Sequence, residues 1–163
     1  MASVDRKNVV DAIESLFNAD TTILYGDAKF INTITTNYTD FINARVTAKT
    51  SYKMFLKANS VQLIESRAQN ADYTVNVVYR VEGYMVNPQT AQDHLDDIDE
   101  RIRYLIENEM HGGTYLSSHF TNSETTVIDM EWLGSDSDVV MEDKEMRVHC
   151  EGNITVSLNR VKL

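Results

Sequence analysis

The chain has 163 residues, a single cysteine and a formal net charge of −10, with 25 acidic and 15 basic residues. The length is typical of one domain, and one proline and six glycines are too few for a flexible linker, so we expect residues 1–163 to form a single domain. Nucleic-acid-binding proteins concentrate positive charge. This acidic chain has no basic run, which argues against specific DNA binding.

The first predicted element is an amphipathic helix over residues 4–17. Apolar residues recur there at helical spacing, namely Val9, Val10, Ile13, Leu16 and Phe17. Asp5 falls in the first turn, where a negative charge suits the helix dipole. Charged residues interrupt the start of the chain, so it does not resemble a signal peptide, and no stretch approaches the length of a membrane span. We therefore expect a cytosolic chain with no membrane contact.

Residues 21–57 carry the weakest pattern. They are rich in Thr and Asn, and poor helix formers separate their apolar residues. We expect mostly loops here, with one short helix or strand. Residues 60–67 are then predicted to form a strand with Val61 and Leu63 on one face, followed by a polar turn at 69–72.

Two long strands are predicted, over about residues 73–86 and 144–159. Both alternate between apolar or small residues and polar ones, a pattern that buries one face of a strand and leaves the other in water. The second strand either continues through Gly152 or folds back in a three-residue loop at 151–153, and both choices keep its apolar residues on one face. We favour the continuous strand because the first strand offers a partner of equal length. The lone Cys150 then lies on the buried face, forms no internal disulfide and fits a reducing compartment.

A helix is predicted between these strands, over about residues 90–109. Its apolar residues recur at helical spacing, and Pro88 favours a helix start because the first helical position needs no N–H donor. Thr90, with Asp93 three residues later, is an alternative cap. Asp97 and Arg101 have the four-residue spacing of a stabilising ion pair. The glycines at 112–113 are expected to end the helix.

A third strand is predicted over about residues 126–133. Residues 134–138 are rich in Gly, Ser and Asp, so we expect a loop there before the last strand. Together the elements predict an α+β fold, in which two main helices cover one face of an antiparallel or mixed sheet. The other face is exposed or contacts a neighbour.

Acidic residues are the main candidates for a functional surface. Five begin the second main helix and two lie in the predicted loop, namely Asp93, Asp96, Asp97, Asp99, Glu100, Asp136 and Asp138. On a helix of about 3.6 residues per turn the first five spread around the circumference, so we expect a solvated helix start, with a partner-facing patch and a cation site as alternatives. Asp136 and Asp138 lack the ligand order of a calcium loop. We treat all seven as candidates for an interface or a channel-facing surface.

No sequence motif points to catalysis. The four histidines lack metal-ligand spacing, and the chain has neither a phosphate-binding glycine loop nor a nucleophile elbow. We therefore expect no enzyme activity, no cofactor and no bound metal.

The order of elements is the most specific feature of the chain. It comprises an N-terminal helix, a Thr/Asn-rich middle, the strand YTVNVVYRVEGYM, the helix QTAQDHLDDIDERIRYLIENE and the stretches TTVIDMEW and EMRVHCEGNITVSLNRVKL. This order resembles that of the tail terminator, or tail completion, proteins of long-tailed bacteriophages over most of the chain. The resemblance implies an α+β subunit that forms a hexameric ring, caps the tail tube and joins it to the head connector, and it implies no catalytic residue.

Two hypotheses follow. In the first, the chain is a virion protein, assembled in the host cytoplasm into a homo-hexameric ring that contacts the tail tube protein and the head–tail connector protein. DNA passes through such a ring without specific binding, because acidic residues repel it. Long strands that overhang a small domain offer unpaired backbone groups, which a cyclic assembly uses. In the second, the chain is a non-catalytic α+β binding module, monomeric or dimeric, for a protein or a small ligand.

Overall fold

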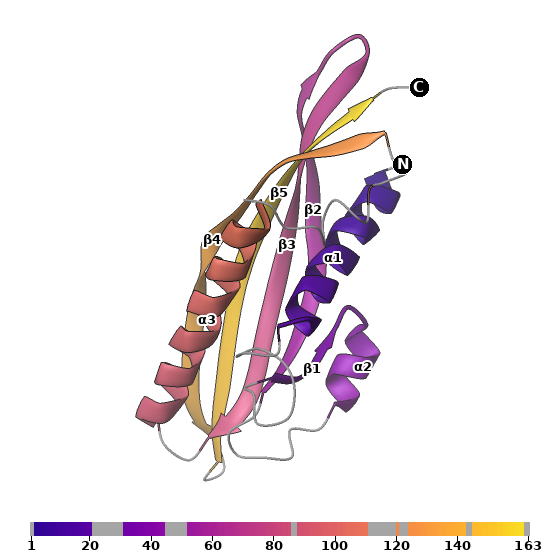
Figure 1. The fold of residues 1–163 in the computed structure, drawn as a ribbon. Coiled ribbons are helices and arrows are strands. Elements are labelled where there is room, and N and C mark those ends of the chain that lie inside the picture. Colours follow the sequence, from indigo (N-terminus) through magenta and orange to yellow (C-terminus); the bar gives the residue numbers. More distant parts are fainter. Residues whose placement is uncertain are drawn as a thin grey trace.

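The computed structural model describes residues 2–20, 31–44, 52–85, 88–110, 120, 124–142 and 145–161. In chain order, the described helices and strands are α1 (Ala2–Asn18), β1 (Ile31–Thr35), α2 (Tyr38–Asn43), β2 (Tyr52–Ser66), β3 (Asn70–Met85), α3 (Pro88–Met110), β4 (Thr125–Glu142) and β5 (Glu145–Val161). The strands form one mixed sheet in the order β1-β2-β3-β5-β4, and helices pack on it (Figure 1). This arrangement confirms the expected α+β fold. No described helix is long and apolar enough to cross a membrane.

The two long alternating strands pair with each other inside the sheet. β3 and β5 run antiparallel in unbroken register over all 16 residues of β3. β5 passes straight through Gly152, so the predicted continuous strand is confirmed. Gly152 lies opposite Tyr79, and a Cβ atom there would clash with the tyrosine ring. The glycine therefore makes room for a side chain and does not form a turn.

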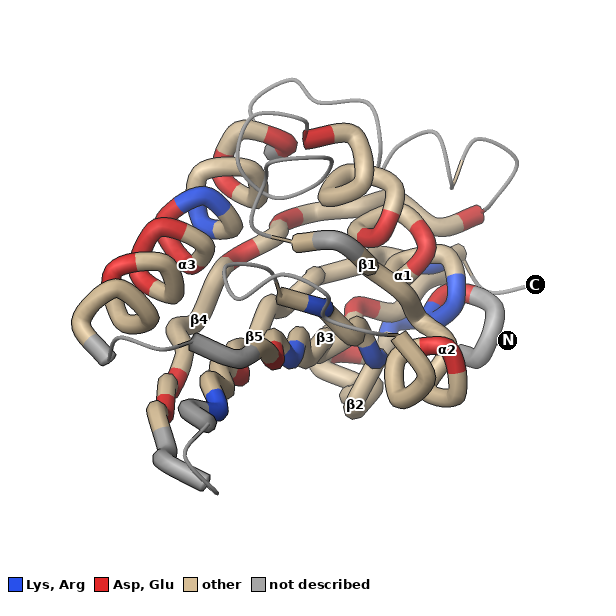
Figure 2. Tube along the Cα trace, turned by 90° about the horizontal axis from the view of Figure 1, so that it is seen from below, with Lys and Arg blue, Asp and Glu red and all other residues tan. Residues whose placement is uncertain are grey.

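One face of the sheet is covered by α1 and α3 (Figure 2). Strand alternation sends a set of buried side chains to this covered face, including Met54, Leu56, Val75, Val77, Tyr79, Val81, Cys150, Ile154, Val156 and Leu158. The helices meet them with apolar stripes that contain Ile13 and Phe17 of α1, and Ile98 and Ile102 of α3. Burying each large aliphatic side chain stabilises the fold by about 1.5–3 kcal/mol. The core is thus a single layer between the sheet and these two helices.

The segment expected to be mostly loop contains two strands and a helix within its described part. β1 pairs parallel with the start of β2. α2 begins at Tyr38, and the Asn37 side chain caps it by accepting a 3.1 Å hydrogen bond from the backbone N–H of Asp40. β2 begins at Tyr52, well before the predicted start of the strand at residue 60. Pairing with β1 and β3 thus outweighs the weak local preference of these residues.

The predicted loop at 134–138 is wrong. These residues lie inside β4, which continues to Glu142 and pairs with β5 along this stretch. Gly134 has a φ of 111° and lies at a register shift that follows Trp132, where the chain needs a backbone conformation that favours glycine. A β-bulge at this glycine, together with an already formed partner strand, allows the polar sequence to stay in the sheet.

α3 begins at Pro88, the earlier of the two starts that the sequence allows and two residues before the predicted range, whereas the predicted cap at 112–113 lies outside the described residues. The predicted partner of Arg101 is wrong. Its guanidinium forms a two-pronged pair with Asp20, with Nη2–Oδ1 at 2.8 Å and Nε–Oδ2 at 3.1 Å, while Asp97 is exposed. Arg101 therefore ties α3 to the end of α1.

The hairpin formed by β2 and β3 projects beyond the helices (Figure 1). Its turn comes earlier than the predicted 69–72, because β3 already begins at Asn70, whose carbonyl accepts a 2.8 Å hydrogen bond from the Arg67 N–H. β2 alternates between buried and less buried residues as far as Ala58, and residues 59–66 are exposed or half-buried. We call residues 59–72 the hairpin arm.

Candidate functional site

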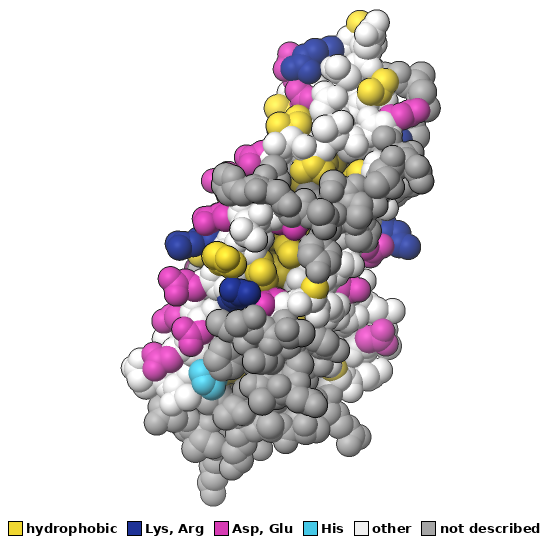
Figure 3. Space-filling model, viewed as in Figure 1, with side chains coloured by type: hydrophobic (Ala, Val, Ile, Leu, Met, Phe, Trp, Pro, Cys, Tyr) yellow, Lys and Arg dark blue, Asp and Glu magenta, His cyan; other side chains and the backbone are white. Residues whose placement is uncertain are grey.

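Four of the seven acidic candidates lie on the outer side of α3. Asp93, Asp96, Asp97 and Glu100 are exposed, and Figure 3 shows acidic side chains gathered along this helix. Asp93 and Asp96 each accept a 2.9 Å hydrogen bond from a glutamine four residues earlier. These four side chains form a solvated face of α3.

Asp99 differs from its neighbours because it points into the sheet. Its Oδ1 accepts a 2.9 Å hydrogen bond from the Tyr79 hydroxyl, and its Oδ2 accepts one from Ser135. Cys150 Sγ lies 3.4 Å from Asp99 Oδ1, and Trp132 Nε1 donates to the Tyr79 hydroxyl at 2.8 Å. We call these five residues the Asp99 cluster, which joins α3 to β3, β4 and β5.

The Asp99 cluster keeps its tyrosine and its cysteine protonated. Burial raises the pKa of the Tyr79 hydroxyl, and the Asp99 carboxylate raises it further. Burial also raises the pKa of the Cys150 thiol, again with a contribution from Asp99. The thiolate is the reactive form of cysteine, so Cys150 is not an activated nucleophile. The arrangement holds α3 on the sheet.

Asp136 and Asp138 lie on the face of the sheet opposite α1 and α3, which we call the open face. They pair in β4 with Glu151 and His149 of β5. The seven candidates are thus divided among the outer side of α3, the interior beneath α3 and the open face. They do not form one continuous surface.

Charged residues on the open face lie in rows across the strands, with basic residues towards β2 and β3 and acidic residues on β4. One row crosses the sheet through Lys53, Glu82, His149 and Asp138, and the next contains Arg80, Glu151 and Asp136. Arg80 Nε lies 2.9 Å from Glu82 Oε1, and His149 Nε2 lies 3.6 Å from Glu151 Oε2. Each of these pairs lies within one strand, β3 and β5 respectively, and ion pairs near the surface contribute about 0–1 kcal/mol. The open face is therefore compatible with water or with a polar partner.

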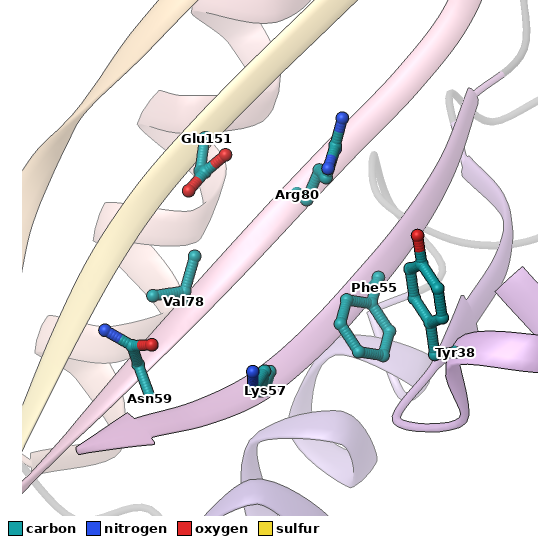
Figure 4. A pocket seen from close by; sticks show the side chains of 7 residues that line it. All are labelled: Tyr38, Phe55, Lys57, Asn59, Val78, Arg80 and Glu151. Atoms are coloured by element: carbon teal, nitrogen blue, oxygen red, sulfur yellow. The ribbon is translucent and has the colours of Figure 1, made fainter.

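A groove of about 530 Å³ lies on the open face beside α2 (Figure 4). Its walls are Tyr38, Phe55, Lys57, Asn59, Val78, Arg80 and Glu151. The rings of Tyr38 and Phe55 stand edge to face at one side, with centroids 5.5 Å apart, and Glu151 lies at the other side. Aromatic surface next to both charge signs is suited to binding a short peptide segment or a small ligand with polar groups.

The hairpin arm carries two exposed aliphatic side chains. Leu63 is 63% exposed and Ile64 is 60% exposed. At the tip, Arg67 pairs with Glu65 at 2.7 Å and with Asp72 at 3.0 Å. A hydrogen bond from the Asn159 amide, together with the Arg67 charge, lowers the pKa of Asp72. The arm therefore has a polar, cross-linked tip and an apolar stretch just below it.

The sequence placed Asp5 at a helix start but did not indicate that it is a buried hydrogen-bond acceptor that joins α1 to the sheet. The residue is 1% exposed. Its carboxylate accepts hydrogen bonds from the Tyr73 hydroxyl, from Thr125 Oγ1 at 3.1 Å and from Arg160 Nη1 at 2.7 Å. A signal was present, because Asp5 lies four residues before Val9 and so falls on the apolar stripe of α1. A charge on that stripe needs buried partners.

No group of three or more His, Cys, Asp or Glu side chains in the described part of the chain is arranged to hold a metal ion. No family model matches the chain, and no curated protein matches its sequence. The fold and the site therefore define a class: an α+β protein with helices on one face of a five-stranded mixed sheet, a charged open face and a projecting hairpin arm.

Proposed function

We propose that this protein is a ring-forming structural component of a long-tailed bacteriophage, a tail terminator or neck protein that caps the tail tube and connects it to the head. The observation that carries the proposal is the hairpin arm, which extends past the helices with Leu63 and Ile64 in solvent. Exposed aliphatic side chains on an extended strand are typical of a surface that another subunit covers.

The order of elements supports the same function. A helix, a variable segment, a long hairpin, a second helix and two long strands follow each other in the order that resembles the tail terminator proteins. The Asp99 cluster is consistent with a structural role, because its carboxylate joins α3 to the sheet and burial raises the pKa of its thiol.

The acidic character of the chain fits a passage for DNA. Its net charge is −10, and the exposed carboxylates on α3 and on the open face repel phosphate groups. In this proposal DNA slides through the ring without specific binding. The partners of the ring are the tail tube protein and the head–tail connector protein, and the assembled product is part of the virion.

The mass of the purified protein in solution tests the proposal, with negative-stain microscopy as the second readout. We expect closed rings of about six subunits, the number implied by the resemblance and allowed by cyclic symmetry, which bind to the end of tail tubes assembled from the tube protein of the same phage. A protein that stays monomeric both alone and with those tubes contradicts the proposal.

The groove beside α2 favours a second candidate, a non-catalytic binding module for a protein or a small ligand. This function predicts a monomer or dimer whose melting temperature rises when the groove is occupied. Arg80→Ala should abolish that rise, because Arg80 supplies a cation to the groove wall. Asp93→Ala on the outer side of α3 serves as the control and should leave the rise unchanged.

A further inference from the structure

A hollow of about 310 Å³ lies between α1 and β2, close to the point where β1 ends. Arg6, Lys7 and Asp11 of α1 line it, together with residues 56–58 of β2 and Thr36, which follows β1. We call this hollow the α1–β2 pocket. Its volume is at the lower end of the range of ligand pockets, about 300–1,000 Å³, so it suits a short segment or a small ligand.

The α1–β2 pocket is basic, although the chain as a whole is acidic. Of its described charged residues, Arg6, Lys7 and Lys57 are basic and Asp11 is acidic. Lys7 Nζ lies 4.0 Å from Asp11 Oδ2 on a side chain that is 77% exposed, so this ion pair is weak. Within the described part of the chain, no ion pair joins Arg6 or Lys57 to a carboxylate, and both are exposed. These two cations are therefore available for an anion.

The β2 side of the pocket offers backbone groups as well as charge. β1 pairs with β2 only from Tyr52 to Phe55, so residues 56–58 have a strand partner on one side only within the described part of the chain. The outer N–H and C=O groups of such an edge can pair with an extended peptide. A free anion uses the cations and leaves this edge unpaired, whereas an extended acidic peptide uses both.

Cations lie on both sides of this edge. A strand that pairs with the edge sends its side chains alternately to the two faces of the sheet. On the covered face they meet Arg6 and Lys7, because α1 packs there. On the open face they meet Lys57, which alternates with the buried Leu56 and Ala58. Successive acidic residues therefore have a basic partner on either face.

A nucleic acid fits the pocket less well than an acidic peptide. Proteins that bind single strands combine a basic groove with aromatic side chains on which the bases stack. No aromatic residue is among the described residues that line the pocket. Its three basic residues also lie beside an open strand edge, and a phosphate backbone has no N–H groups to pair with that edge.

We propose that the α1–β2 pocket binds an extended acidic segment of a partner protein. The segment adds as a strand to the β2 edge at residues 56–58 and places its carboxylates against Arg6, Lys7 and Lys57. The proposal goes beyond the ring-forming function and does not depend on it, because the edge and the cations all belong to one subunit.

Fluorescence anisotropy at low ionic strength tests the proposal with a labelled, end-blocked peptide of glutamate residues. Lys57 also lines the groove beside α2, so the test variant changes α1 alone: Arg6→Gln with Lys7→Gln. We expect this variant to bind the peptide about tenfold more weakly, because two charge-assisted contacts are lost. Both positions are exposed, so the variant should fold, and a melting curve checks this.

Two control variants leave the pocket intact. Arg103→Gln with Arg147→Gln removes the same charge from exposed positions on α3 and β5, and it should keep the affinity within about twofold. Arg80→Gln changes the groove beside α2 and should have as little effect. A glutamate peptide with N-methylated backbone amides keeps its charge but cannot donate to the β2 edge, so it should bind about tenfold more weakly to the wild type.

Other outcomes overturn the proposal. A peptide that does not bind the wild type, or that loses equal affinity in the α1 variant and its charge-matched control, has no specific site here. A loss in Arg80→Gln alone means that the peptide binds in the groove beside α2. An N-methylated peptide that binds as tightly as its parent, or inorganic phosphate that displaces the peptide at an equal concentration of charge, indicates a site for free anions. Single-stranded DNA of equal charge that binds more tightly than the peptide indicates a nucleic-acid site.

Discussion

The covered face and the open face of the sheet use carboxylates in different ways. On the covered side Asp5, Asp20 and Asp99 lie among the helices and the sheet, and each has hydrogen-bond donors on another element. On the open face Asp136 and Asp138 are exposed in β4. The buried Asp5 and Asp20 and the half-buried Asp99 tie α1 and α3 to their neighbours, whereas the exposed carboxylates leave the open face available for a partner.

The physical reason for the difference is desolvation. A carboxylate taken out of water loses several kcal/mol of hydration, which only close donors can offset. Donors in one fixed geometry then specify one packing arrangement. An exposed carboxylate keeps its hydration and gains little from a neighbouring charge. We therefore expect substitutions of carboxylates beneath the helices to change the free energy of unfolding strongly, and substitutions on the open face to change it little.

Asp5→Ala is the substitution with the largest expected effect. It removes the acceptor for Tyr73, Thr125 and Arg160 and leaves the Arg160 charge without that partner. We expect the free energy of unfolding to fall by about 3–5 kcal/mol, measured by urea denaturation. Asp11→Ala, on a more exposed part of α1, is the control and should change it by less than about 0.5 kcal/mol. If both variants lost the same free energy of unfolding, buried and exposed carboxylates would not differ in their contribution to stability.

Gly152→Ala tests the packing of the covered face directly. The new methyl group meets the Tyr79 ring, whose hydroxyl is held by Asp99 and Trp132 and so cannot move without losing hydrogen bonds. We expect a loss of about 1–3 kcal/mol by the same denaturation measurement. Asn153→Ala, at the next residue on the other face, should have a much smaller effect. An unchanged midpoint for the glycine variant would mean that Tyr79 packs elsewhere.

Alkaline pH should weaken the covered face through its tyrosines. Burial, together with the hydrogen bond to Asp5, raises the pKa of Tyr73 from 10.0 to about 12. A raised pKa favours the folded state while the hydroxyl is protonated, so this contribution is complete below pH 10 and is lost as pH rises towards 12. The free energy of unfolding should therefore fall across that window, and Tyr73→Phe should make the fall shallower. A flat profile in the wild type would contradict the buried position of Tyr73.

Asp136→Asn should have the smallest effect, and in the opposite direction. Asp136 lies across from Glu151 on the open face, and like charges opposite each other destabilise a sheet. Removing one charge should raise the free energy of unfolding by about 0.2–1 kcal/mol at low salt. High salt should abolish the gain because it screens exposed charges. A clear loss of stability would mean that Asp136 makes a stabilising contact that outweighs its repulsion from Glu151.

Much of the sheet could be predicted because apolar and polar residues alternate along its central strands, β3 and β5, in step with their buried and less buried positions. The alternation around Cys150 identified the covered face of β5, and its continuation through Gly152 followed from a partner of equal length. Residues 134–138 gave the opposite signal, because Gly, Ser and Asp prefer turns in isolation. Pairing with β5 supplies backbone hydrogen bonds along that stretch, and these outweigh the local preference.

The candidate site was less predictable for the same reason. The spacing of the acidic residues on α3 correctly indicated a solvated helix face, but it could not single out Asp99. That residue turns inward because Tyr79 and Ser135, which are far from it in sequence, place donors beneath it. Helical periodicity describes one element at a time, so it carries no information about donors on a neighbouring strand.

By itself the sequence determined the α+β class, a helix that begins close to Pro88 and which side of β3 and β5 is buried, since each depends on local periodicity or on the geometry of proline. Only the tertiary structure decided that Asp5 is buried and that Asp99 is held against the sheet, and that β2 and β4 form the ends of the long antiparallel part of the sheet. These features depend on which strands become neighbours, and that order arises from the packing of the whole chain.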